Sequence, residues 1–98
     1  MEKIRFMFDY CASSCLWGGE GVLPLENFPI SDGLKATLRA LCREYDTCLN
    51  WNDPASGAVW TEAQWESFRM RALSAYDALA AELNGVVQVQ NDLHLSIG

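Results

Sequence analysis

Basic side chains, histidine and long apolar runs are all scarce in this 98-residue sequence. It has 7 Lys and Arg residues against 13 Asp and Glu residues, which gives a formal net charge of -6 at pH 7. Non-specific binding to nucleic acid or to an anionic membrane requires clustered basic side chains, so the charge balance argues against both and favours a basic protein partner. No segment reaches the roughly 18 consecutive apolar residues that a membrane-spanning helix requires.

The N-terminal residues lack the features of a secretory signal. Lys3, Arg5 and Asp9 interrupt the apolar residues, and no small-residue cleavage site follows. We therefore expect a cytoplasmic protein. Ile4, Phe6 and Phe8 fall at every second position. This alternation predicts a β-strand over residues 3–9 with one apolar face.

Residues that carry out catalysis are also few. The single histidine, His94, lies near the end of the chain, where we expect an inert, outward-facing strand residue. The glycine-rich segment 18–21 lacks the lysine and the serine or threonine of a phosphate-binding loop, and its Glu20 would repel a phosphate. We therefore expect neither enzyme activity nor a cofactor.

Four cysteines, at positions 11, 15, 42 and 48, permit more than one interpretation. In a cytoplasmic protein they stay reduced. A helix would place Cys42 and Cys48 about 240° apart around its axis, so this pair cannot bind one zinc ion together, and burial as small hydrophobic side chains explains it better. Cys11 and Cys15, in a serine-containing loop, leave open a small cysteine-based metal or redox protein.

The chain has room for one domain, residues 1–98, and for two long helices. Ser31 is suited to cap a first helix over residues 32–48, whose apolar residues follow the spacing of one buried stripe. Those residues are Leu34, Leu38, Leu41, Cys42, Tyr45 and Leu49. The turn-rich segment 50–58, with Pro54, ends this helix.

The start of a second helix, over residues 62–83, is the best-marked boundary in the chain. Thr61 and Gln64 stand at the spacing of a capping box, in which each side chain bonds the other residue's backbone N–H. Trp60 and Trp65 occupy the two positions of a hydrophobic staple. The staple accounts for both of these tryptophans without a binding role.

Shorter apolar alternations predict strands near the C-terminus. Residues 86–90 and 93–97 each alternate, and Asn91-Asp92 between them is suited to a hairpin turn. Residues 11–30 show no sustained period and contain glycine and proline, so we expect an irregular, packed loop. The resulting class is α+β, with two helices packed on a small antiparallel sheet in the order β-α-α-β-β.

Acidic and aromatic residues in loops and near the helix ends are the candidates for partner binding. Tryptophan is both a core residue and the type most enriched at binding hot spots, and Trp17 and Trp51 each lie close to a carboxylate in sequence. The candidate residues are Trp17, Glu20, Glu44, Asp46, Trp51, Asp53 and Glu62. A solvated acidic face is the alternative explanation for the carboxylates.

The charged residues are also spread unevenly along the sequence. Lys35, Arg39 and Arg43 share one face of the first helix, whereas carboxylates concentrate in the loops and at the start of the second helix. We therefore expect an acidic end on the folded protein that faces a basic partner.

Several segments together resemble a known protein family. They are Asp9-Tyr10, Cys15-Leu16-Trp17-Gly18, Leu23-Pro24-Leu25 and the run from Tyr45 to Pro54. Over about residues 5–83 the chain resembles small acidic bacterial immunity proteins of contact-dependent or polymorphic toxin systems.

This resemblance implies a cytoplasmic, non-enzymatic protein that binds and blocks a cognate toxin, often a nuclease with a basic active site. It does not identify the residues that make the contact. Two alternatives stay open beside it, the cysteine-based metal or redox protein and an oligomeric regulatory adaptor.

Overall fold

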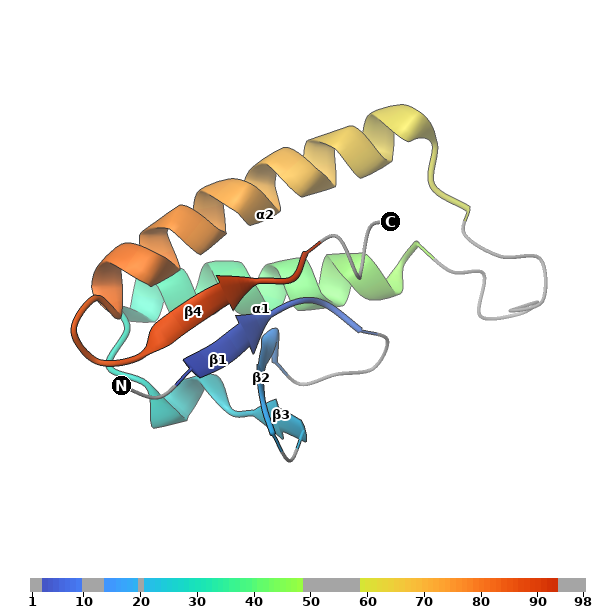
Figure 1. Cartoon of the computed structure of the whole chain (residues 1–98). Coiled ribbons are helices and arrows are strands. Elements are labelled where there is room, and N and C mark those ends of the chain that lie inside the picture. Colours follow the sequence, from blue (N-terminus) through green and yellow to red (C-terminus); the bar gives the residue numbers. More distant parts are fainter. Residues whose placement is uncertain (1–2, 10–13, 20, 49–58, 94–98) are drawn as a thin grey trace.

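Two helices and a four-stranded sheet make up the described part of the chain, residues 3–9, 14–19, 21–48 and 59–93 of a computed structural model (Figure 1). The α+β class expected from the sequence is confirmed. In chain order the elements are β1 (Lys3–Phe6), β2 (Leu16–Gly18), β3 (Gly21–Leu23), the 3-10 helix η1 (Leu25–Asn27), α1 (Asp32–Asp46), α2 (Glu62–Glu82) and β4 (Gln88–Asn91).

The sheet is mixed, with the strand order β3-β2-β1-β4. β1 pairs antiparallel with β2, and β2 with β3, but β4 runs parallel to β1 with Gln88 opposite Lys3. The expectation of a wholly antiparallel sheet is therefore wrong. The physical reason is the path of α2, which returns the chain to the end of the sheet where β1 begins, so that β4 runs in the direction of β1.

Part of the segment expected to be an irregular loop is regular. β2 and β3 form a hairpin that is closed by the pair Gly18 and Gly21. Gly21 has a φ of 125°, a conformation that residues with a side chain rarely adopt. The expectation for residues 11–30 is wrong here because strands of three residues are too short to show an alternation in sequence.

Both helix starts expected from their capping residues are confirmed. The Ser31 Oγ accepts a backbone N–H of the first turn of α1 at 3.3 Å. At α2, Thr61 and Gln64 form the complete capping box, with hydrogen bonds of 3.2 and 2.8 Å. The rings of Trp60 and Trp65 lie edge to face with centroids 4.8 Å apart, as a hydrophobic staple requires.

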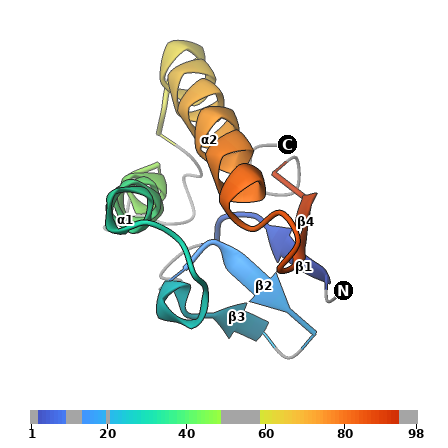
Figure 2. The ribbon, with the colours of Figure 1, turned by 90° about the vertical axis from the view of Figure 1, so that its left-hand side faces the viewer.

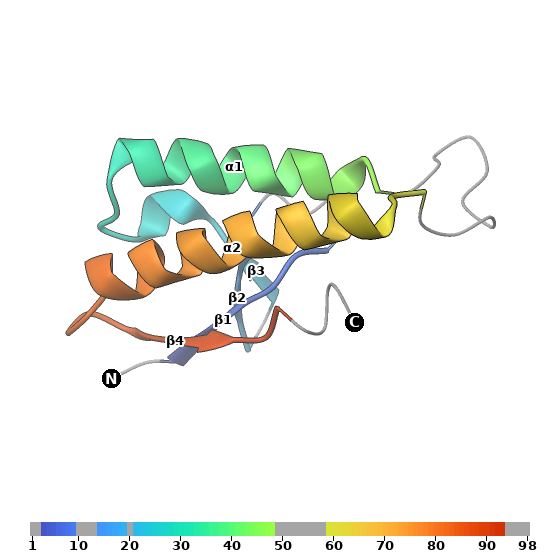
Figure 3. The ribbon, with the colours of Figure 1, turned by 90° about the horizontal axis from the view of Figure 1, so that it is seen from above.

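The helices lie side by side in opposite directions (Figure 3) and on the same face of the sheet (Figure 2). α1 ends at Asp46 and α2 at Glu82, within two residues of the expected ends. The core lies between the helices and the sheet. Its largest fully buried apolar side chains are Phe6, Leu16, Leu25, Leu38, Phe68, Leu79 and Leu83.

A buried carboxylate secures the join between β1 and β4. The Asp92 N–H donates to the Phe6 carbonyl at 3.0 Å, and the Asp92 carboxylate, which is buried, forms an ion pair with Arg5. Asp92 therefore continues the pairing with β1, and the expectation of a hairpin turn at Asn91-Asp92 is wrong. Residues 94–97 of the expected final strand lie outside the described residues.

Side chains also form hydrogen bonds with backbone groups in and next to β4, which is one edge of the sheet. The Tyr76 hydroxyl on α2 donates to the Val89 carbonyl at 2.9 Å. The Asn91 Oδ1 accepts the Leu93 N–H at 3.0 Å. Tyr76 thus ties α2 to β4 through one hydrogen bond in addition to apolar packing.

The capping box at α2 leads to a testable expectation. Thr61→Ala removes the acceptor for the Gln64 N–H, so we expect the free energy of unfolding, measured by urea denaturation, to fall by about 1 kcal/mol. Thr37→Ala is the control, because Thr37 is exposed inside α1 and donates only to the Gly33 carbonyl. The control should stay within about 0.5 kcal/mol of the wild type, and equal effects of the two substitutions would contradict the capping role.

Candidate functional site

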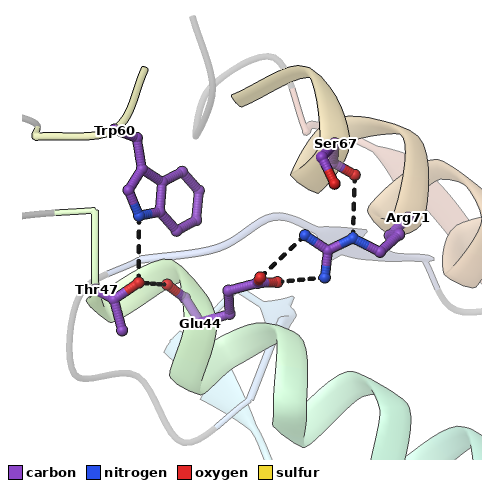
Figure 4. Close-up of polar contacts among 5 residues, drawn as sticks. All are labelled: Glu44, Thr47, Trp60, Ser67 and Arg71. Atoms are coloured by element: carbon purple, nitrogen blue, oxygen red, sulfur yellow. Dashed lines mark hydrogen bonds and ion pairs between the residues drawn. The ribbon is translucent and has the colours of Figure 1, made fainter. Parts of the chain in front are cut away.

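The end of α1 and the start of α2 meet at a hydrogen-bonded helix junction, which we define by Glu44, Thr47, Trp60, Ser67 and Arg71 (Figure 4). The Trp60 indole donates to the Thr47 Oγ1 at 3.2 Å, and this hydroxyl donates to the Glu44 carbonyl at 2.7 Å. Thr47 is the C-cap of α1, and Trp60 directly precedes the N-cap of α2. The junction therefore positions the two helix ends relative to each other.

An ion pair crosses the junction from one helix to the other. Both terminal nitrogens of Arg71 donate to the Glu44 carboxylate, at 2.7 and 2.9 Å, and the Arg71 Nε donates to the Ser67 carbonyl at 3.2 Å. This bidentate geometry is specific to arginine and fixes the orientation of the carboxylate. The side chains stay 36% and 51% exposed for Glu44 and Arg71, so solvent screens the pair.

A groove of about 870 Å³ runs between α1 and α2 next to this ion pair. Leu34, Leu41 and Ala75 are its buried members, and small or polar side chains, exposed except for the half-buried Glu44, complete its lining. The other lining residues are Thr37, Ala40, Arg43, Glu44, Thr47, Arg71, Ser74 and Ala78. The described residues that line the groove include no histidine or cysteine.

The structure brings three of the sequence-predicted site residues to the same end of the helices. Glu44 lies in the last turn of α1, Asp46 is its final residue, and Glu62 is the first residue of α2. Glu62 is exposed, and its charge at a helix N-terminus is favourable. Glu20, Trp51 and Asp53 lie outside the described residues.

Trp17 lies on the sheet instead of at the helix junction. It belongs to β2, and its indole donates to the Met7 carbonyl at 3.0 Å. Across the strands it stands between Arg5 and Val22 in register. Its ring is half-buried, so Trp17 contributes to the sheet and still presents a surface.

Ion pairs offset part of the acidic surface that the sequence suggests. Glu26 pairs with Arg39, and Glu66 with Arg69, in addition to the pair between Glu44 and Arg71. The basic face of α1 therefore has a carboxylate next to it, because Arg39 contacts Glu26. The acidic end expected from the sequence stays a prediction.

Sequence reasoning missed Arg71 and Thr47, which shape the junction. Arg71 is 27 residues from Glu44, so no local spacing in the sequence signals the pair. The signal for Thr47 is also weak, because a threonine at a helix end has many other uses. The spacing predicts only the staple for Trp60, whose indole N–H also donates to the Thr47 hydroxyl.

The cysteines behave as core residues in the described part of the chain. Cys15, Cys42 and Cys48 are buried, which confirms the expectation for Cys42 and Cys48 as small buried side chains. A hydrogen bond with Cys42, together with burial, raises the pKa of the Cys15 thiol well above its usual range. Cys11 lies outside the described residues, among which no cluster of three metal-ligating side chains occurs.

Comparison with known proteins supports the resemblance seen in the sequence. A family model described as Serratia CdiI immunity protein-like matches residues 2–91, which take in every element from β1 to β4. No curated protein matches the chain. Neither α1 nor α2, the two α-helices of the described ranges, is long and apolar enough to cross a bilayer.

The burial of Cys15 predicts low reactivity. A thiol reacts as its thiolate and only when reagent reaches it, so we expect iodoacetamide at pH 8 to label Cys15 more than about tenfold slower in the folded protein than in denaturant. Peptide mass spectrometry separates Cys15 from the other cysteines. Fast labelling of Cys15 in the folded protein would contradict this burial.

The exposed ion pair at the junction predicts a small coupling. A double-mutant cycle with Glu44→Gln and Arg71→Gln should give a coupling free energy of at most about 1 kcal/mol for unfolding. Repeating the cycle at high salt should reduce the value further. A coupling that is unchanged by salt would show that solvent does not screen the pair.

Proposed function

Because this chain belongs to the Serratia CdiI immunity protein-like family, we propose that it binds a cognate toxin and neutralises it without catalysis. Membership supports a toxin-neutralising, protein-binding role in general terms. We further propose that the toxin is a nuclease with a basic active site. The excess of 13 acidic over 7 basic residues supports this choice, since an acidic inhibitor complements a surface that binds phosphates.

The observation that carries the proposal is the helix junction. It places exposed Glu62 and half-buried Glu44 and Asp46 on helix ends whose geometry is fixed by capping and by the Trp60 hydrogen bond. Binding groups on rigid elements lose little conformational entropy on association. We propose that these three carboxylates contact the toxin.

The loop residues of the sequence prediction extend the proposed contact. Trp51 and Asp53 fall in the segment that joins α1 to α2, next to the junction in sequence. We include both as proposed contacts, in which the aromatic ring supplies apolar area and the carboxylate supplies charge. We also propose Trp17, which lies on β2 and not at the junction, and Glu20 as further contacts.

The physical mechanism is occlusion. Electrostatic attraction between an acidic inhibitor and a basic cleft speeds association, and the bound inhibitor then covers the surface that the nucleic acid needs. We place this encounter in the cytoplasm, where the toxin would meet its substrate. The inhibitor needs no cofactor for such a role.

The cysteine-based alternative has less support. It relies on Cys11 and Cys15 acting together, whereas Cys15 is buried and hydrogen-bonded to Cys42. A buried thiol with a raised pKa is a poor metal ligand and a poor nucleophile. We therefore propose no second function from these residues.

Co-expression tests the proposal. The chain is produced together with the product of the neighbouring reading frame, and we expect cell survival, co-purification of the two proteins and loss of nucleic-acid cleavage in the purified complex. A chain that neither binds that product nor protects against it overturns the immunity function. Binding and protection without any nuclease activity in the free toxin would overturn only the choice of a nuclease.

A charge reversal tests the contribution of the junction. Glu62→Lys should weaken binding to the toxin by roughly tenfold, since it replaces an attractive contact by a repulsive one. Asp32→Lys is a matched control, because Asp32 is also an exposed first residue of a helix but lies at the opposite end of the helix pair. Equal loss in both variants would remove the junction from the contact.

A further inference from the structure

Helix α2 carries apolar side chains on two faces. Its buried residues Phe68, Ala72, Ala75 and Leu79 follow spacings of four, three and four and pack into the core. Such a stripe accounts for one side of an amphipathic helix. The side away from this stripe should be polar if it only meets water, and it is not wholly polar.

A second series of residues on α2 has helical spacing as well. Glu62, Glu66, Met70, Leu73 and Asp77 follow spacings of four, four, three and four. At 100° per residue they lie about 120–200° around the axis from Phe68, so they form one continuous strip on the outer side of the helix. We call these five residues the α2 outer stripe.

The centre of the α2 outer stripe is exposed and apolar. Met70 is 64% exposed and Leu73 is 39% exposed. Their spacing of three makes them neighbours on the helix surface. The other large apolar side chains exposed in the described ranges are Val22, Val59 and Val86, which are far from one another in sequence. Single exposed apolar residues are ordinary, whereas an adjacent pair on a rigid helix is a candidate contact.

We propose that the α2 outer stripe is the docking surface for the cognate toxin, which presents an apolar pocket for Met70 and Leu73 with lysine or arginine at its rim. This inference rests on the proposed function and names the surface that performs it. The stripe begins at Glu62, which is already proposed as a contact and lies two residues after Trp60 of the helix junction.

The charges around the stripe support a basic occupant. Glu62 and Glu66 precede the apolar pair, and Asp77 follows it. Arg69 pairs with Glu66 and offsets one of these charges, which leaves an excess of negative charge along the strip. An apolar centre with a charged rim is the usual arrangement of a protein interface. Methionine adapts its shape to a pocket more readily than branched side chains do.

The same charges disfavour three other partners for the stripe, namely a second copy of the chain, an anionic membrane and a nucleic acid. A second copy of the chain in antiparallel pairing would set Glu66 close to the partner's Asp77, and the like charges would repel each other. An anionic membrane or a nucleic acid would also be repelled. A basic protein surface is the occupant that fits both the apolar centre and the acidic rim.

Truncation of the apolar centre tests the proposal. Binding of the purified chain to the purified toxin encoded by the neighbouring reading frame is measured for the wild type and for the variant Met70→Ala/Leu73→Ala. We expect the Kd to rise at least tenfold, mostly through faster dissociation. Both side chains are exposed and alanine favours helices, so the variant should fold like the wild type.

Val86→Ala is the matched control for truncation. Val86 is 52% exposed and follows α2 outside the stripe, and its truncation should leave the Kd within about twofold of the wild type. An unchanged Kd of the Met70→Ala/Leu73→Ala variant, with tight binding by the wild type, overturns the docking surface and leaves the proposed function intact. Failure of the wild type to bind the toxin overturns the proposed function itself.

Neutralising the rim tests the charge argument separately. Glu66→Gln/Asp77→Asn should slow association several-fold at low salt, and the difference should shrink as salt rises. Asp32→Asn, which removes a carboxylate at the far end of the helix pair, should not slow association to this extent. A wild-type dimer in light scattering that Met70→Ala/Leu73→Ala converts to a monomer would overturn the basic partner in favour of a second copy.

Discussion

The packing of Phe68 is the contact on which the rest of the structure depends. This fully buried ring on α2 lies 5.1 Å from the ring of Phe8, 5.9 Å from that of Tyr45 and 5.3 Å from that of Trp60, measured between centroids. These three neighbours come from the chain after β1, from α1 and from the helix junction. One aromatic side chain thus joins both helices to the segment that follows β1, and its packing against Trp60 supports the geometry of the junction.

Small side chains on α2 explain the shape of the helical layer. Ala72 and Ala75 are buried, so α2 can approach its neighbours closely on these positions. Where α2 faces α1 at the surface, Ala78 and Ser74 are too small to fill the space between the two helices, and this space is the groove described above. The small side chains of α2 therefore have two results, which are close packing at Ala72 and Ala75 and the groove at Ser74 and Ala78.

The sequence predicts what depends on local spacing and misses what depends on direction or on distant partners. Caps at Ser31 and Thr61 define both helices, because each cap satisfies backbone groups within one turn. The parallel direction of β4 follows from how α2 crosses the sheet, which no short pattern encodes. The pair between Glu44 and Arg71 joins residues 27 positions apart. Trp17 shows a further limit of prediction from sequence. Its indole N–H donates to the Met7 carbonyl, and no short sequence pattern indicates this structural role on the sheet.

The hydroxyl of Tyr76 has a consequence for how the protein meets other chains. An edge strand with free carbonyls invites a further strand, and this is a route to aggregation as well as to recognition. On the β4 side, Tyr76 occupies the Val89 carbonyl, and Asn91 occupies the Leu93 N–H. These two hydrogen bonds use backbone groups that an added strand would need, so they disfavour strand addition at this edge and leave contacts through side chains as the alternative.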